Sequence, residues 1–253
     1  FNKNTLKSVA QIDFTNEGLR PMKLAFANAT DAYLICENYN KLILLDILYF
    51  KKAREIDLPT FATDILALGN KIYITLPLEN QLAIVDSRSH SIVSTIAIDN
   101  RPYIFALTSS ANNLIVLSAG GGKLPQDPME SLSGPSVTNI DLASSSIVST
   151  NPLVVPLYEI TNKYPKEFVI TNNDWGFFSL DSMLVKIDAR DITFSISLYN
   201  AILSNFSQNY LANEIFVLEK TDFGSFIEKL NPISGAIEEK VQSQLNLTSF
   251  VSF

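Results

Sequence analysis

Short apolar stretches and polar turns alternate along the whole chain. Runs rich in Ile, Val, Leu, Phe, Tyr and Thr recur at about ten-residue spacing between Asn, Asp, Ser, Gly and Pro, which is typical of an all-β protein. Clear examples are residues 32–37 (AYLICE), 71–76 (KIYITL), 113–117 (NLIVL), 167–171 (EFVIT) and 214–218 (EIFVL). Helical patterns are scarce, so we expect strands throughout and no helix longer than about three turns.

A longer repeat is superimposed on these strands. After each of the five examples, a second apolar run ends in an acid or an amide. These anchor residues are Asp46, Asp86, Asp141, Asp188 and Asn231, at intervals of 40, 55, 47 and 43 residues. A short turn and a further strand-like run follow each anchor. A period of about 40–45 residues with four short strands per unit is typical of β-propeller blades.

Five complete blades fit between the ends of the chain. Residues 6–14 (LKSVAQIDF) have the pattern of a blade's last strand, and residues 248–253 (TSFVSF) that of a first strand. We therefore expect one domain, residues 1–253, with six blades, in which the two termini share the closing blade and leave no sheet edge exposed. The five complete blades are expected at residues 20–59, 60–99, 100–153, 154–199 and 200–245.

The repeat resembles that of the YVTN-repeat, surface-layer-protein-like β-propellers. The resemblance is carried by residues 71–75 (KIYIT), 81–86 (QLAIVD), 91–99 (SIVSTIAID) and 168–172 (FVITN). It implies a propeller fold, and because that family more usually builds seven blades, a seven-bladed propeller with sequence missing from this chain is the alternative. The resemblance also implies a non-enzymatic protein outside the cytoplasm: extracellular, at the cell surface or periplasmic.

One insertion interrupts the repeat at residues 119–136 (AGGGKLPQDPMESLSGPS) and lengthens one interval to 55 residues. Long loops on a stable scaffold often carry function, although a solvated loop without a role is an equal alternative. The Gly run lacks the spacing of a phosphate-binding loop. The loop side chains that we expect to contact a partner are Lys123, Gln126, Asp127, Met129 and Glu130.

Two aromatic residues are further candidates for partner binding. Trp175 is the only tryptophan, and Tyr103 follows an Arg-Pro pair. An aromatic ring at a blade edge can stack on a sugar or anchor a protein partner. For Trp175, a place in the core is the favoured alternative.

Composition excludes several functions. Lys and Arg number 19 and Asp and Glu number 26, so the net charge is −7, which argues against nucleic-acid binding. A single Cys and a single His leave no Cys-based or multi-His metal site. His90 falls in a predicted turn and Cys36 in a predicted buried strand. The Asp anchors are expected to cap turns rather than bind metal, so no catalytic residue, metal or cofactor is expected.

Three classes of function remain open. The favoured one is a non-enzymatic interaction or scaffold propeller that binds a protein or another macromolecule of the cell envelope through one rim, as a component of a larger assembly. The alternatives are a propeller enzyme or redox-enzyme subunit of the lactonase-like kind, and a glycan-binding propeller. No apolar run reaches the length of about 20 residues that a transmembrane helix needs. Glycosylation sequons begin at Asn28, Asn205 and Asn246.

Overall fold

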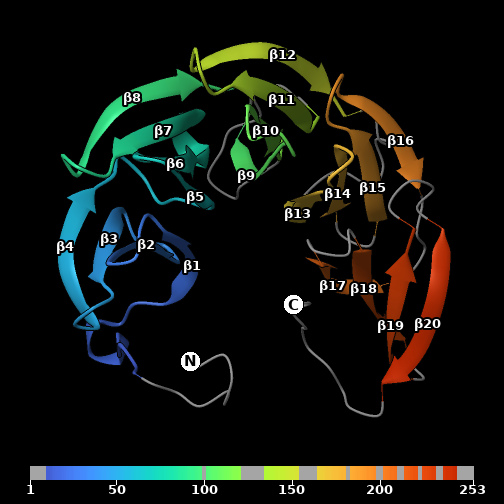
Figure 1. The fold of residues 1–253 in the computed structure, drawn as a ribbon, viewed down its shortest axis with the longest axis horizontal. Helices are drawn as coiled ribbons and strands as arrows, with labels where there is room; N and C mark the ends of the chain where they lie inside the picture. Colours follow the sequence, from blue (N-terminus) through green and yellow to red (C-terminus); the bar gives the residue numbers. More distant parts are fainter. Residues whose placement is uncertain are drawn as a thin grey trace, which may run out of the picture. The chain divides into compact units, whose positions relative to one another are not determined.

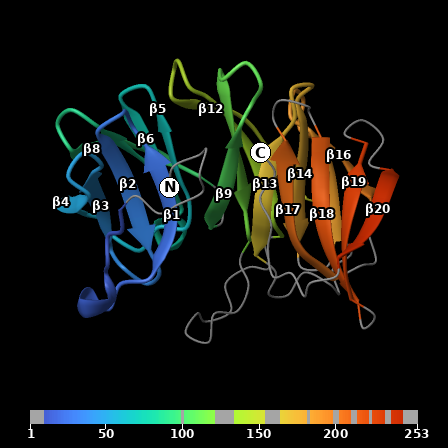
Figure 2. The same cartoon turned by 60° about the horizontal axis from the view of Figure 1, so that its bottom comes forward.

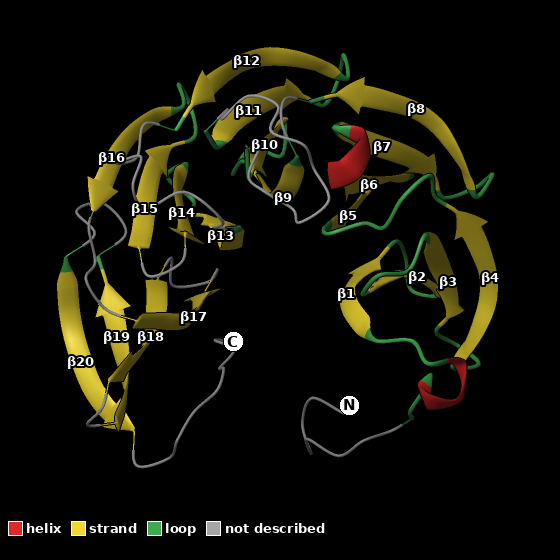
Figure 3. Ribbon diagram, turned by 180° about the vertical axis from the view of Figure 1, so that it is seen from behind, coloured by secondary structure: helices red, strands yellow, loops and turns green. Residues whose placement is uncertain are grey.

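The structure of the protein is a computed structural model. The helical segments that it describes are two short 3-10 helices, η1 (Thr15–Glu17) and η2 (Pro77–Glu79), drawn in red in Figure 3. Neither is long or apolar enough to cross a membrane. The prediction of an all-β structure is confirmed for the described residues, which are 10–98, 101–120, 134–153, 164–180, 183–197, 202–209, 214–221, 224–231 and 236–243.

The chain forms two compact units, Phe1–Pro102 and Tyr103–Phe253. The first unit contains two four-stranded antiparallel sheets, and the strands of each sheet follow one another in chain order (Figure 1). The strands of this unit are β1 (Pro21–Phe26), β2 (Asp31–Cys36), β3 (Lys41–Asp46), β4 (Lys51–Asp57), β5 (Ile65–Leu68), β6 (Lys71–Leu76), β7 (Gln81–Asp86) and β8 (Ser91–Ala97).

The second unit contains three four-stranded sheets, also ordered along the chain; the strands of the last one stand side by side in Figure 2. Each of the five predicted blades therefore holds one observed sheet, while the count of six blades stays a prediction. The strands are β9 (Pro102–Leu107), β10 (Asn113–Ser118), β11 (Ser136–Asp141), β12 (Ser146–Pro152), β13 (Pro165–Ile170), β14 (Trp175–Leu180), β15 (Met183–Asp188), β16 (Thr193–Ser197), β17 (Ile202–Asn209), β18 (Glu214–Thr221), β19 (Gly224–Leu230) and β20 (Ile237–Ser243).

Burial explains why the middle strands are continuously apolar. Five of the six residues of β2 are buried, whereas β4, at the edge of the same sheet, buries one of seven. A middle strand has both faces covered and needs apolar side chains on both. In the first unit, Tyr33 and Leu44 of one sheet pack with Ile74 and Val85 of the other in a single core.

The Asp anchors cap turns, as predicted. A carboxylate oxygen of each accepts a hydrogen bond from a backbone N–H two or three residues later, which fixes the turn to the next strand. The turns that follow the four Asp anchors, residues 47–50, 87–90, 142–145 and 189–192, are called the Asp turns below. The donors for Asp46, Asp86, Asp141 and Asp188 belong to Tyr49, Ser89, Ser144 and Arg190, at 3.0, 2.7, 2.7 and 3.1 Å.

The N-terminal segment departs from the prediction of a strand at residues 6–14. Its described part, from residue 10 to Phe14, is not in a strand and leads into η1. Phe14 is buried against Leu34, Ile43 and Leu45 of the first sheet. The described part of the segment thus covers a face of the first sheet, and burial of the Phe14 side chain stabilises it there. The predicted partner strand, residues 248–253, lies outside the described residues.

Candidate interaction surfaces

The predicted insertion leaves and rejoins one sheet at the same point. Ser118, the last residue of β10, is the cross-strand partner of Ser136, the first residue of β11. The loop between them is therefore anchored at one end of this sheet. The predicted contact residues on this loop, Lys123, Gln126, Asp127, Met129 and Glu130, lie outside the described residues.

The two aromatic residues that were predicted to bind a partner, Tyr103 and Trp175, lie at opposite ends of the second unit's strands. Tyr103, near the start of β9, stacks on Tyr164 with ring centroids 4.8 Å apart. Tyr164 directly precedes β13, whereas Trp175 follows the turn at its far end. A strand of six residues spans about 20 Å. A single small ligand therefore cannot use both rings, and Tyr103 shares its sheet end with the insertion.

Trp175 is covered by cations. The ammonium of Lys186 lies 3.8 Å from the ring centroid, and the guanidinium of Arg190 lies 5.6 Å from it. The ring also packs beside the buried residues Phe177 and Ile215. One aromatic face is thus occupied, which weakens the case for Trp175 as a sugar-stacking platform and agrees with its alternative place in the core.

Lys186 is a buried cation without a carboxylate partner among the described residues; its exposed fraction is 6%. Burial lowers its pKa, and the nearby charge of Asp188 acts in the opposite direction. Asp188 itself binds Arg190 through Nε, at 2.7 Å, and through a second guanidinium nitrogen. Those hydrogen bonds hold the pKa of Asp188 below its usual value. In the last sheet, Lys229 occupies the equivalent position but pairs with Glu214 at 2.7 Å.

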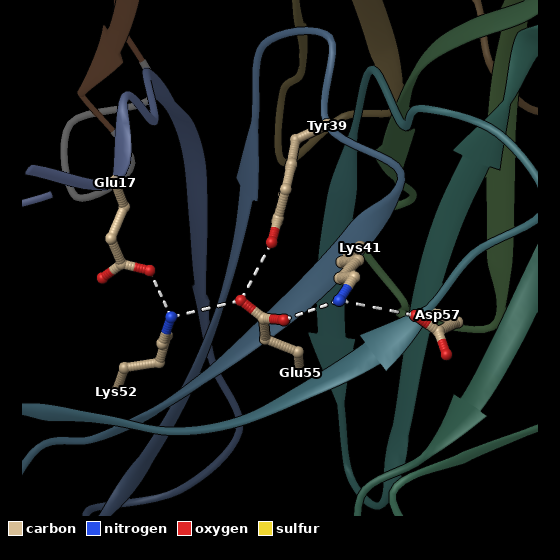
Figure 4. Close-up of polar contacts among 6 residues, drawn as sticks. All are labelled: Glu17, Tyr39, Lys41, Lys52, Glu55 and Asp57. Atoms are coloured by element: carbon tan, nitrogen blue, oxygen red, sulfur yellow. Dashed lines mark hydrogen bonds and ion pairs between the residues drawn. The ribbon is translucent and has the colours of Figure 1, made fainter.

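A polar network joins η1 to the outer strand of the first sheet (Figure 4). Glu55 of β4 accepts hydrogen bonds from Lys41 (2.8 Å), from the hydroxyl of Tyr39 (2.9 Å) and from Lys52 (3.2 Å). Lys52 also contacts Glu17 of η1. The hydrogen bond from Lys41 does most to lower the pKa of Glu55, to about 2. A general base needs a pKa near the working pH, so the lowered pKa of Glu55 does not suit that role; the network connects η1 to β4.

The lone Cys and the lone His both take part in the packing of the first unit. Cys36 is fully buried, as predicted, and burial raises the pKa of its thiol. His90 is half-buried, and its Nδ1 lies 2.9 Å from the hydroxyl of Tyr33 on the neighbouring sheet. The sequence predicted a turn for His90 but not this contact. Among the described residues, no three His, Cys, Asp or Glu side chains gather closely enough to hold a metal.

The structure reveals an exposed apolar turn that the sequence analysis missed. The exposed fractions of Leu48 and Tyr49 in the first Asp turn are 62% and 74%. The same two turn positions are exposed in the other Asp turns, where they hold smaller or polar residues. Comparing the aligned turns could have found this from the sequence. The equivalent pairs are Arg88-Ser89, Ala143-Ser144 and Arg190-Asp191.

The last residue of each Asp turn has a positive φ and contacts the sheet that precedes it where this is described. His90 (φ 52°) reaches Tyr33, and the backbone oxygen of Ile192 (φ 56°) accepts a hydrogen bond, at 3.4 Å, from the side chain of Asn151 in β12. Phe50 (φ 50°) holds the same position in the first sheet, yet its exposed fraction is 43%. It extends the apolar surface of Leu48 and Tyr49. We refer to residues 48–50 as the aromatic turn.

Phe26 lies at the same end of the first sheet and is also exposed. The β1–β2 and β3–β4 turns lie together at this end, where the backbone N–H of Ile47 donates a hydrogen bond to the backbone oxygen of Thr30. Its counterparts in other sheets, Ala67 of β5 and Ile170 of β13, contribute to cores between neighbouring sheets. At this position the first sheet therefore exposes an apolar side chain, whereas the β5–β8 and β13–β16 sheets pack theirs against a core.

Comparisons with known proteins support the fold. No family model matches the chain, and no curated protein matches it. Among solved structures, hydrazine synthase from Kuenenia stuttgartiensis, which contains a β-propeller, matches with a TM-score of 0.70 and 11% identity over 91% of this chain and 77% of that one. The chain has a fold of the β-propeller type. Because 1283 chains of solved structures match, the likeness identifies no activity, and hydrazine synthase being an enzyme does not make this chain one.

Proposed function

We propose that the chain is a non-enzymatic interaction module that binds a protein partner through the aromatic turn. The observation that carries the proposal is the exposure of Leu48 and Tyr49 at positions where the other Asp turns hold Arg, Ser, Ala and Asp. Burying one large apolar side chain contributes about 1.5–3 kcal/mol. Tyrosine is enriched among the residues that dominate protein interfaces.

Two hydrogen-bonded carboxylates are poorly suited to general acid–base catalysis. Glu55 has a lowered pKa and is hydrogen-bonded by Lys41, Tyr39 and Lys52, and Asp188 is bound by Arg190. A candidate acid or base would need a pKa shifted toward neutrality in a cleft. The extracellular, cell-surface or periplasmic location implied by the family resemblance is part of the proposal, and fractionation of the producing cells tests it.

The test replaces the aromatic turn by its counterpart in the third sheet. Leu48→Ala with Tyr49→Ser reproduces Ala143-Ser144 without changing charge. The matched control is Val93→Thr, which removes an apolar side chain of 56% exposure from β8. The immobilised chain is cross-linked to native envelope fractions, and captured proteins are quantified.

We expect the double variant to keep its fold and to lose partners that the Val93→Thr variant retains. An unchanged set of captured proteins would reject the aromatic turn as the binding surface. A variant in which residues 120–134 are replaced by a short Gly-Ser link tests the predicted insertion in the same way. If only that variant keeps its fold and loses binding, the insertion, and not the aromatic turn, is the binding surface.

A further inference from the structure

One cation adjoins the aromatic turn, and two more lie in the same unit; none of the three has an ion-pair partner among the described residues. Lys51 follows the turn directly, and its ammonium lies 5.4 Å from the ring centroid of Tyr49. Arg54 lies further along β4, in register with Leu44, which is itself opposite Tyr33. Both cationic side chains are exposed.

A third cation comes from the neighbouring sheet. The contact of His90 with Tyr33 brings the second Asp turn, residues 87–90, against the first sheet. That turn carries Arg88, which is exposed and has no ion pair among the described residues. Lys51 and Arg88 therefore lie in or beside turns of the first unit, and Arg54 lies further along β4, opposite Leu44 and in line with Tyr33.

The acidic groups near these turns are already engaged by the fold. Asp46 and Asp86 accept backbone hydrogen bonds within their turns, and Asp31 accepts one from the side chain of Asn28 at 2.9 Å. The hydrogen bonds from Ser89 and Arg88 hold the pKa of Asp86 below its usual value. These three carboxylates are only partly exposed. These hydrogen bonds do not remove the carboxylates' charge, but Lys51, Arg54 and Arg88 are more exposed to solvent than the three carboxylates, in a chain whose net charge is −7.

We propose that the aromatic turn recognises an acidic protein segment, in which an aliphatic or aromatic side chain packs on Leu48 and Tyr49 while neighbouring Asp or Glu side chains meet Lys51, Arg54 and Arg88. This deepens the proposed function and rests on it. Apolar contact supplies most of the affinity, because exposed charge pairs contribute little. The cations select the partner and accelerate association in a salt-dependent way.

Selection from a random peptide display library tests the chemistry of the partner. Peptides are selected on the full chain, and those still bound by the Leu48→Ala, Tyr49→Ser variant are discarded. We expect the remainder to be enriched in Asp or Glu beside an aliphatic or aromatic residue. The triple variant Lys51→Gln, Arg54→Gln, Arg88→Gln should bind them about tenfold more weakly at low salt, with little difference at high salt.

The matched control is Arg20→Gln, which removes an 82% exposed cation from the same unit and should leave binding unchanged. If no peptide depends on Leu48 and Tyr49, the proposed function fails at this surface. If peptides depend on them but are neutral or basic, only the acidic partner is overturned. Phosphatidylglycerol vesicles are the second probe: vesicle binding that the double variant loses, without selection of acidic peptides, would assign the turn to a lipid surface and overturn the inference.

Discussion

The hydroxyl of Tyr33 lies 2.9 Å from Nδ1 of His90 and connects two neighbouring sheets of the first unit. Tyr33 is fully buried, and burial raises its pKa to about 12. The only histidine of the chain therefore contributes to packing between sheets.

Replacing Tyr33 by Phe should lower the free energy of unfolding by about 1 kcal/mol at pH 8, since one buried hydrogen bond is lost. Folded Tyr33 keeps its proton up to about pH 12, whereas the unfolded chain loses it near pH 10. The wild-type protein therefore loses stability as pH rises above 10, and the gap to Tyr33→Phe should narrow. Urea unfolding at pH 8 and pH 11 measures this; a constant gap would contradict it.

Truncating Phe14 to Ala should lower the free energy of unfolding by about 3 kcal/mol, because the side chain is buried between the N-terminal segment and the first sheet. Deleting residues 1–14 should lower the melting temperature clearly for the same reason. Phe26→Ala is the matched control, since Phe26 is 62% exposed and should change stability by less than about 0.5 kcal/mol. Equal losses for the two Phe variants would show that the segment does not pack as described.

Glu55→Gln should weaken the attachment of η1 and cost about 1 kcal/mol at pH 7. The pKa of Glu55 is lowered to about 2 in the folded protein. Its contribution is therefore complete above the unfolded pKa of 4.5 and is lost as pH falls toward 2. Thermal unfolding measured between pH 7 and pH 2.5 should show the melting temperature of the wild-type protein approaching that of the variant as the pH falls. Asp57→Asn serves as control because Asp57 is 91% exposed and 3.8 Å from Lys41.

Gly176→Ala should destabilise the second unit by about 1–3 kcal/mol through overpacking. A Cβ at this position would lie 2.6 Å from Cγ1 of Ile187 and 3.0 Å from Cε2 of Phe168. Ile187→Ala makes room for the added methyl group. The double variant should therefore lose less free energy of unfolding than the two single variants lose in total. Denaturant unfolding of all four proteins measures the coupling, and simple additivity would argue against the clash.

Lys186→Met should leave the protein at least as stable at pH 7, because an unpaired cation is replaced by an apolar side chain of similar length. Lys229→Met should be destabilising, because it leaves Glu214 without its partner. The pKa of Lys186 is lowered by burial, so its penalty is present below the folded pKa and is relieved as pH rises toward 10.5. If both variants lose the same free energy of unfolding, the contact of the Lys186 ammonium with the Trp175 ring stabilises the cation as much as a carboxylate partner would.

The candidate site was predictable only in part. Trp175 and Tyr103 were identified as aromatic residues near blade edges, but their separation across β13 follows from strand direction and ring stacking. The exposure of Leu48 and Tyr49 was not predicted from the sequence, because residues 42–50 form one nearly continuous apolar run. Neighbouring strands bury the first part of that run and leave the aromatic turn exposed, and this coverage is decided by the tertiary structure.

The sequence by itself determined the strands, their grouping in fours and the capping role of the Asp anchors. These features arise from local alternation of apolar and polar residues and from hydrogen bonds between residues two or three apart. Only the tertiary structure decided that His90 meets Tyr33, that Phe14 covers a sheet face and that Tyr49 remains exposed. Each of these depends on contacts between distant parts of the chain, and the residue type alone does not specify which surface another sheet will bury.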